Sequence, residues 1–372
     1  MSSTALNHFG LKLVADIAAN DRHKNLFVSP LSLFLALSMT ESGAEGESRK
    51  AMRQTLAVPA DVSEEALHQS ASDLMKSLQA QKGIELNIAN ALWADKSFPF
   101  APDFITRTHT FYQADATTLD FQNAKATADA INTWVKKKTQ EKIPGIVTEQ
   151  DVKSSRAVLT NAVFFRGRWE HPFSEPQTQD APFHRQDGGE KQVPMMRRTD
   201  LKRAYRSGQG YEAAALPYRD SDVELYAILP AHGRSPEDVL AALSVAALLS
   251  SAEPSELDLT LPRFSVEFGP TNLKTTLVHM GMAPAFEDRH EFVPMGSPKF
   301  YINAVLHRTR LEVDEAGTVA TAASAVMMAP MGAAPQPLPR KTLVFDRPFA
   351  VVMCDTQTGA ILFAGVIYDP GK

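Results

Sequence analysis

A run of twelve small, uncharged residues near the C-terminal end constrains the fold of this chain more than any other feature. The run covers residues 318–329, TVATAASAVMMA, and contains no proline and no glycine. Both alternate faces of the run are small enough to enter a packed sheet, yet Pro330, Pro335, Pro337 and Pro339 follow it as in a loop. Exposed loops usually carry residues that prevent strand pairing. The run therefore indicates a segment that can insert into a sheet, with an alanine-rich linker or a short helix as the competing interpretation.

Composition narrows the class of protein. The chain has 372 residues, of which 44% are hydrophobic and 22% charged, as in ordinary globular proteins. Its net charge of −5 implies no attraction to nucleic acid or to an anionic membrane. The N-terminus lacks the pattern of a signal peptide, although a removed signal would leave the same sequence. Cys354 is the one cysteine and no Asn-x-Ser/Thr acceptor occurs, so we expect neither an internal disulfide nor N-glycosylation.

Hydrophobic periodicity places most helices early in the chain and most strands late. The expected helices are residues 5–19, 31–42, 47–56, 63–81, 102–112, 124–142 and 272–281. The expected strands are residues 84–94, 157–165, 210–217, 223–229, 256–262, 304–313, 341–345, 350–355 and 361–368. Since no linker, repeat or low-complexity segment interrupts this order, we expect one α+β domain over residues 1–372.

Eight segments in a fixed order resemble one protein family. They are NLFVSPLSLFLALSMTESGAEGES (25–48), NALWAD (90–95), INTWVKKKTQEKI (131–143), LTNAVFFRGRWEHPF (159–173), VPMM (193–196), LPRFSVEF (261–268), MGMAPAF (280–286) and FDRPFAVVMCDTQTGAILFAGVIYDP (345–370). Each segment is weak evidence alone, but all eight in order make coincidence improbable. On these residues the chain is identified as a member of the serpin family, resembling an inhibitory, non-glycosylated, prokaryote-like member. Ala350 departs from the pattern, because the family usually has a larger apolar residue there.

The resemblance implies a fold and a mechanism. The expected fold has three β-sheets, about nine helices, a metastable native state and an exposed reactive-centre loop at residues 315–344. In this family a serine protease cleaves the loop and becomes acylated, and the loop then inserts into the main sheet and distorts the protease. The chain would then be a suicide-type inhibitor and not an enzyme, with no cofactor or metal. A non-inhibitory carrier, chaperone or storage protein with the same fold is the alternative.

The resemblance also assigns the parts of the loop. The hinge, residues 315–325, begins with Glu315, Ala316, Gly317, Thr318, Val319, Ala320, Thr321, Ala322 and Ala323. Its lack of bulk and of charge after Glu315 favours an inhibitor. The family's spacing puts the scissile bond after the residue fourteen positions beyond Gly317, which is Met331–Gly332. The subsites Met328, Ala329 and Pro330 precede it and suit chymotrypsin-, elastase- or subtilisin-like proteases. Met327 and Met328 are alternative sites, and Arg340–Lys341 is a second site at which a trypsin-like protease would treat the chain as a substrate.

A second group of residues resembles the region of the serpin main sheet that opens when the loop inserts. Ser29, Ser32, Asn161 and His307 match a polar cluster beneath the main sheet, and Trp169 matches a tryptophan where the hinge enters. Serine and histidine also raise the hypothesis of a hydrolase. We discount it, because the chain has no Gly-x-Ser-x-Gly elbow and Ser29 precedes a helix-starting proline.

The expected partner is a target serine protease, held in a covalent acyl complex. Nucleic acid and membranes are not expected partners. Residues 63–82 lack the cluster of lysine and arginine that heparin-activated relatives use, so no strong heparin site is expected. We expect a monomer with a hazard of loop–sheet polymerisation, and this function favours an extracellular or periplasmic location.

Overall fold

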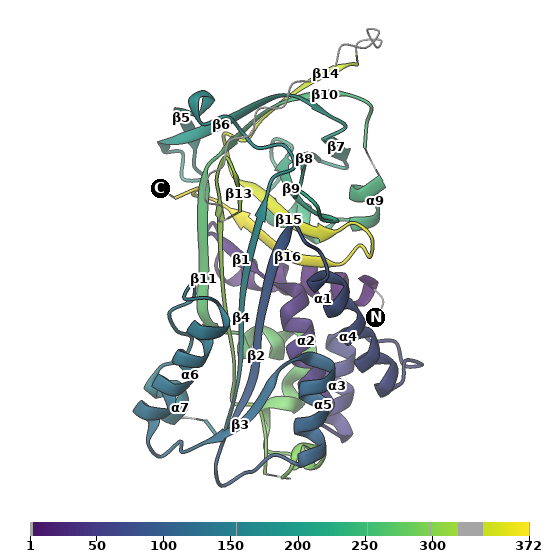
Figure 1. Cartoon of the computed structure of the whole chain (residues 1–372), viewed down its shortest axis with the longest axis vertical. Coiled ribbons are helices and arrows are strands. Elements are labelled where there is room, and N and C mark those ends of the chain that lie inside the picture. The colour runs from purple at the N-terminus through teal and green to yellow at the C-terminus, as the bar shows by residue number, and fades with distance from the viewer. Residues whose placement is uncertain (1–2, 154, 251, 298, 319–337, 372) are drawn as a thin grey trace.

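Most of the helices lie at one end of the molecule, and long strands run from that end to the other, where most of the shorter strands lie (Figure 1). The computed structural model describes residues 3–153, 155–250, 252–297, 299–318 and 338–371. Within these residues the α-helices are α1 (Ser3–Asn20), α2 (Pro30–Glu41), α3 (Gly46–Thr55), α4 (Glu64–Gln79), α5 (Pro102–Tyr112), α6 (Ala124–Lys138), α7 (Glu149–Lys153), α8 (Pro236–Ala241), α9 (Val245–Ser250) and α10 (Lys274–Leu277).

The strands form three sheets, which we call the long, inner and upper sheets. The long sheet has the order β11 (Phe264–Asn272), β12 (Ala304–Val313), β13 (Gly317–Thr318), β4 (Ala157–Arg168), β2 (Ile84–Asp95) and β3 (Asp115–Leu119). The inner sheet has the order β1 (Leu26–Val28), β16 (Ile361–Ile367), β15 (Phe349–Asp355), β9 (Val223–Pro230), β8 (Tyr211–Pro217) and β7 (Tyr205–Gly208). The upper sheet has the order β14 (Arg340–Val344), β10 (Glu256–Pro262), β6 (Glu190–Lys202) and β5 (Gln179–His184).

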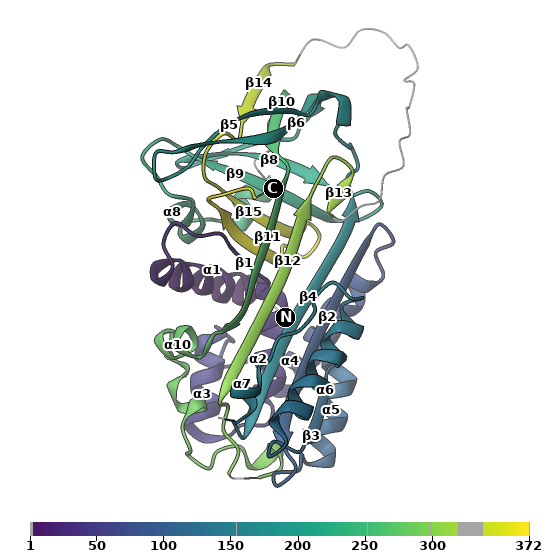
Figure 2. The ribbon, with the colours of Figure 1, turned by 90° about the vertical axis from the view of Figure 1, so that its left-hand side faces the viewer.

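Two strands at the middle of the long sheet are joined over only part of their length. β12 runs parallel to β4, and residues Ala304 to Arg310 pair with Val158 to Phe164. Above this point the short strand β13 lies between them and pairs antiparallel with both, as Figure 2 shows. The two strands therefore separate only at the top of the long sheet, where β13 lies between them, and below it they pair directly with each other. We call the line between β4 and β12 the slot.

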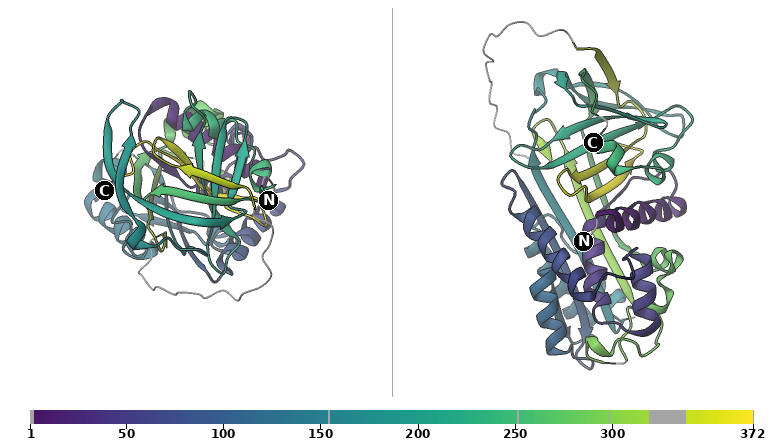
Figure 3. Two further views of the ribbon diagram at one scale, coloured as in Figure 1. Left: turned by 90° about the horizontal axis from the view of Figure 1, so that it is seen from above. Right: turned by 90° about the vertical axis from the view of Figure 1, so that its right-hand side faces the viewer.

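The core has two parts, one on each face of the long sheet. The larger part lies between the long sheet, the inner sheet and the helices α1 and α2. α1 crosses the molecule between the inner sheet and the other helices (Figure 3). α6 covers the opposite face of the long sheet, where Trp93, Ile131, Val135, Val158 and other apolar residues are buried together.

Local sequence explains how α2 begins. The Ser29 side chain accepts a hydrogen bond from the Ser32 backbone N–H, and Pro30 occupies the first turn. Both residue types are favoured at these positions, since serine caps a free N–H and proline needs no partner for one. All residues of α2 are buried, so this helix is covered on every side and is not amphipathic.

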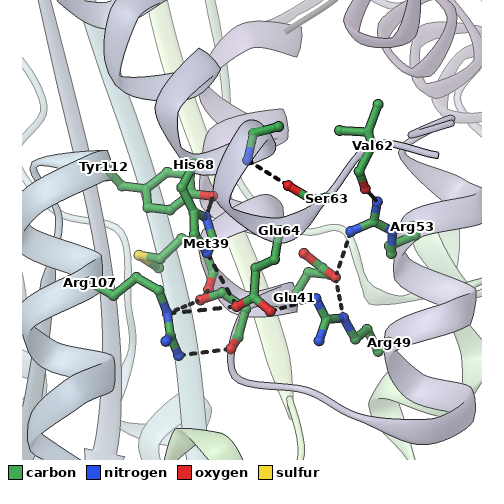
Figure 4. A network of polar contacts seen from close by, with 12 residues as sticks. Met39, Glu41, Arg49, Arg53, Val62, Ser63, Glu64, His68, Arg107 and Tyr112 are labelled. Carbon is green, nitrogen blue, oxygen red and sulfur yellow. Dashed lines mark hydrogen bonds and ion pairs between the residues drawn. The ribbon is translucent and has the colours of Figure 1, made fainter. Parts of the chain in front are cut away.

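A buried network of ion pairs holds the C-terminal end of α2 (Figure 4). Glu41 is fully buried, and its carboxylate accepts a hydrogen bond of 2.8 Å from Arg49 Nε. Arg49 also donates to Glu64 at the start of α4, over 2.7 Å. Burial raises the pKa of Glu41, although Arg49 and Arg53 both act to lower it. The network thereby ties α2, α3 and α4 to one another.

Two of the expected helices were wrong in extent. The helix expected at residues 272–281 begins later than expected, because β11 runs to Asn272, and only its first part, α10 (Lys274–Leu277), is α-helical. A π-helical turn follows, and Gly281 with φ +112° breaks it. The helix expected at 124–142 ends at Lys138, since Gln140 and Glu141 adopt positive φ. Among the described helices, none has the length and hydropathy of a membrane span.

Candidate functional site

The chain that follows β12 turns back sharply and enters the long sheet as β13. The Asp314 carboxylate accepts hydrogen bonds from the backbone N–H groups of Ala316 and Gly317, at 2.9 and 3.0 Å. The Asp314 N–H donates to the Gly317 carbonyl over 2.9 Å. A Cβ atom on Gly317 would lie 2.2 Å from the Gly167 carbonyl oxygen. Glycine is therefore required at residue 317 for the chain to approach β4 this closely.

Thr318 is the last described residue of this segment and is already seated in the slot. It is completely buried, and it pairs with Val313 of β12 and Gly167 of β4. Its hydroxyl lies 2.6 Å from the hydroxyl of Tyr218. Burial raises the pKa of Tyr218, so the phenol is neutral at physiological pH.

Trp169 joins this contact to the turn before it. Its indole stacks on the Tyr218 ring at a centroid distance of 4.6 Å. Its Nε1 donates to the Asp314 carbonyl over 2.9 Å, and its backbone N–H donates to the Ala316 carbonyl over 3.0 Å. Trp169 therefore contacts the turn between β12 and β13 through both its side chain and its backbone.

The first hinge residue is fixed by an ion pair. The Glu315 carboxylate accepts from Arg263 over 2.7 Å and from the Thr178 hydroxyl over 2.6 Å. Burial opposes ionisation of Glu315, but the hydrogen bonds from Arg263 and Thr178 outweigh it and lower the pKa of the carboxyl. Sequence reasoning missed Thr178 and Tyr218, because they lie far from the hinge in the chain and belong to none of the eight segments. It also missed Arg263, although this residue lies within the segment LPRFSVEF.

Lower in the slot, the structure brings Ser29, Ser32, Asn161 and His307 together. His307 of β12 lies opposite Asn161 of β4 in the register, and its Nδ1 is 2.5 Å from Asn161 Oδ1. Its Nε2 accepts a hydrogen bond of 3.3 Å from the Ser29 backbone N–H. All four residues are buried, and burial lowers the pKa of His307 to about 3. The histidine is therefore neutral, with the proton on Nδ1.

Asn90 is a fifth member that the sequence analysis did not single out. It lies opposite Asn161 in the β2–β4 register and accepts hydrogen bonds from Asn161 and from the Ser32 hydroxyl, the latter over 3.3 Å. Asn161 also donates to Ser32. The signal was available, since Asn90 opens the segment NALWAD. These five residues form what we call the slot cluster, which spans β2, β4, β12 and the start of α2.

The slot cluster does not have the geometry of a hydrolase. The Ser29 hydroxyl donates to the Leu362 carbonyl over 2.7 Å, so its proton is directed away from His307. Only the backbone of Ser29 contacts the imidazole. The Ser32 hydroxyl contacts Asn90 and Asn161. In the described structure neither serine has the histidine base that a nucleophile requires.

Much of the expected loop lies outside the described residues. This holds for the hinge residues Val319, Ala320, Thr321, Ala322 and Ala323, for Met327, for the subsites Met328, Ala329 and Pro330, and for the bond Met331–Gly332. Arg340 and Lys341 are described and belong to β14, which pairs with β10. Arg340 forms ion pairs with Asp258 at 3.2 Å and Glu256 at 3.5 Å. A trypsin-like protease would have to remove this strand from the upper sheet before cleaving there.

Comparison with known proteins decides the family. The family model described as "Serpin (serine protease inhibitor)" matches residues 4–370. The chain belongs to the serpin family. This confirms the family expected from the eight segments and the α+β fold with three sheets. Members of this family are described as protease inhibitors and not as enzymes.

The proteins similar to this serpin include a named protease inhibitor and a named thyroxine-binding protein. A relative from Rattus norvegicus that is named as a serine protease inhibitor is 32% identical over 371 residues, covering 97% of this chain and 87% of the relative. The native structure of the thermophilic serpin tengpin has a TM-score of 0.87 at 29% identity, covering 98% of this chain and 93% of tengpin. Human thyroxine-binding globulin has a TM-score of 0.89 at 25% identity, covering 100% and 98% of the two chains. The family thus contains both inhibitors and hormone carriers.

Proposed function

We propose that this serpin is an irreversible, suicide-type inhibitor of serine proteases with chymotrypsin-, elastase- or subtilisin-like specificity. In this proposal the protease cleaves Met331–Gly332 and is acylated, and residues 319–329 then continue β13 down the slot between β4 and β12. The observation that carries the proposal is the position of Thr318, which is buried and paired with both neighbouring strands. The strand that would trap the protease has already begun.

The residues after Thr318 suit the slot. Residues 319–329 contain no charge, no proline and no glycine. Each hydrogen bond that they add to β4 and β12 stabilises the product by about 0.5–1.5 kcal/mol, so the whole run contributes about 10 kcal/mol. Pro330 has no N–H to donate, so insertion is expected to stop near it.

Insertion must also part the slot cluster. A new strand between β4 and β12 widens their separation by about 4.8 Å, the spacing of neighbouring strands. The contact between His307 and Asn161 spans these strands and must break. Asn161 keeps its bonds to Asn90 and Ser32, and His307 keeps its bond to Ser29. These remaining partners lower the cost of opening, since no cluster member is left wholly unsatisfied.

A covalent adduct tests the proposal. Incubation with chymotrypsin or elastase is expected to give an SDS-stable complex and to release a fragment that starts at Gly332. Trypsin serves as the control, because its specificity pocket does not suit methionine. A fragment that starts at Lys341, with no adduct from any of the proteases, would contradict both the site and the inhibitory function.

A carrier without inhibitory activity is the second candidate. The structural similarity to thyroxine-binding globulin favours it. The hinge argues against it, because residues 316–329 carry no charge, no proline and no bulky aromatic residue that would hinder insertion. Cleavage by every protease of the panel without any adduct would favour the carrier.

A further inference from the structure

A small pocket lies beside Trp169, next to the hinge entry point. Its volume is about 300 Å³, and it is bounded by the upper end of β4, the end of β6 and the strands β7 to β9. Its apolar walls are the Trp169 indole, Leu201, Ala204, Ala215 and Leu216, all of them buried. The volume lies at the lower end of the range for ligand pockets, so the pocket suits a small molecule.

The pocket also contains a buried cation, Arg206 of β7. Only 6% of this residue is exposed. Its Nη1 donates to the carbonyls of Arg203 and Tyr205, at 2.5 and 3.1 Å, and the guanidinium lies 6.0 Å from the centre of the Tyr226 ring. Its Nε is buried and has no hydrogen-bond partner in the described structure. A buried donor without a partner is costly, which indicates that a further group completes this site.

No described carboxylate forms an ion pair with Arg206. Glu224 lines the same pocket, but its carboxylate accepts a hydrogen bond of 2.5 Å from the Tyr226 hydroxyl. Glu253, on the neighbouring segment, accepts from the Ser207 hydroxyl over 2.9 Å and pairs with Lys341 at 3.7 Å. The other charged groups at the pocket are Lys202 and Arg203, both cationic, and the neutral or cationic side chain of His171 also lines it. The pocket therefore carries a surplus of positive charge beside an apolar wall.

We propose that this pocket binds a small organic acid with a flat apolar body. The acidic group would accept a hydrogen bond from Arg206 Nε, and the body would pack on the Trp169 indole. Charge-assisted hydrogen bonds are among the stronger ones, and burial of the apolar body adds affinity. The site would recognise the negatively charged oxygen atoms that carboxylates and sulfonates share.

Occupation of the pocket is expected to act on the hinge through Trp169, and this part of the inference rests on the proposed function. The indole holds the Asp314 carbonyl and stacks on Tyr218, whose hydroxyl contacts Thr318. A ligand that fixes the indole therefore stabilises the seated hinge. We expect the rate of adduct formation with chymotrypsin to change when the pocket is filled.

Calorimetry with two matched probes tests binding without reference to inhibition. 1-Naphthalenesulfonate is expected to bind the intact protein at one site, about tenfold more tightly than neutral 1-naphthalenemethanol. Equal affinity for the two probes, or no saturable binding of the sulfonate, would overturn the proposal. If the sulfonate binds and no adduct forms with any protease, the result would support the proposed binding site and contradict the proposed inhibitory function.

Variants locate the site. Arg206→Met removes the guanidinium but keeps an unbranched apolar side chain, and it is expected to weaken sulfonate binding about tenfold, with little effect on the neutral probe. Should this buried variant not fold, the double variant Lys202→Gln with Arg203→Gln changes only exposed side chains at the pocket, and a severalfold loss is expected. Lys125→Gln on α6 removes an equally exposed cation far from the pocket and should change nothing. Unchanged sulfonate binding in the double variant and in folded Arg206→Met would place the site elsewhere.

Discussion

Thr318 is the residue whose size and charge matter most if the loop inserts. Its side chain is completely buried beside Tyr218. Thr318→Arg would place an unpaired cation there, at a cost of several kcal/mol. We expect the protease still to cleave Met331–Gly332 while trapping gives way to turnover of the serpin as a substrate. Titration of a fixed amount of chymotrypsin should show a stoichiometry well above one. Thr318→Ser, which keeps the hydroxyl, is the control, and equal stoichiometry for both variants would contradict insertion at this hinge.

His307 makes stability depend on pH. Burial lowers its pKa to about 3, whereas histidine in the unfolded chain titrates near its ordinary value. The unfolded state therefore binds a proton first, so the contribution of His307 is fully present above about pH 6.5 and is lost progressively as the pH falls toward 3. Between pH 7.5 and pH 5 this loss is about 2 kcal/mol. His68 adds to the same trend, since burial lowers its pKa too.

The free energy of unfolding, measured in urea at pH 7.5 and pH 5, tests this dependence. His307→Gln cannot titrate, so we expect it to lower stability at pH 7.5 but to flatten the change between the two pH values. His232→Gln, at an exposed position, should leave the change as it is. If His307→Gln shows the same loss on acidification as the unaltered protein, the buried imidazole is not its source.

At the scale of elements, the pairing of strand β14 controls how fast a trypsin-like protease can cleave after Arg340. Arg340 is held by the pairing of β14 with β10 and by ion pairs with Glu256 and Asp258. Exposed ion pairs contribute about 0.2–1 kcal/mol each, so the two together hold the strand by about 1 kcal/mol. Glu256→Gln combined with Asp258→Asn is therefore expected to speed trypsin cleavage after Arg340 about fivefold. Timed gels measure the rate, and an unchanged rate would show that the ion pairs do not protect the site.

Elements with strong periodicity were predicted well, and elements that depend on neighbours were not. The strand expected at 157–165 is apolar throughout and is confirmed as part of β4. β5 and β6 were missed, since their exposed, charged residues do not alternate clearly and become strands only through pairing with each other. The helix expected at 272–281 begins at Lys274 for a related reason, because β12 draws residues up to Asn272 into the long sheet.

At the scale of the whole molecule, the proposed function requires a native state above its free-energy minimum. Cleavage at Met331–Gly332 should then stabilise the protein, because residues 319–329 can enter the slot only once they are free at one end. The gain of about 10 kcal/mol would raise the unfolding midpoint by about ten degrees, at roughly 1 °C per kcal/mol for a chain of 372 residues. A thermal melt of intact and cleaved protein measures the change, and an equal or lower midpoint after cleavage would exclude insertion.

The slot between β4 and β12 can also accept the loop of another molecule when these two strands part. Mild heating is therefore expected to give linear polymers, because the slot of one copy and the loop of the next form a contact that does not close on itself. Size-exclusion chromatography after heating detects them. Prior cleavage of the loop serves as the control, since it fills the slot, and polymers that form equally well from cleaved protein would point to a different contact.

The sequence by itself determined the family and the three-sheet fold class, because these depend on local patterns and on ordered segments within the chain. It also named four members of the slot cluster through their motifs. Only the tertiary structure decided that Thr318 is already seated, that Tyr218 and Arg263 hold the hinge, and that Arg206 lies buried beside Trp169. The contacts of Tyr218 with Thr318 and of Arg263 with Glu315 join residues about 50 to 100 positions apart in the chain. Their geometry follows from how the sheets pack and not from any local preference.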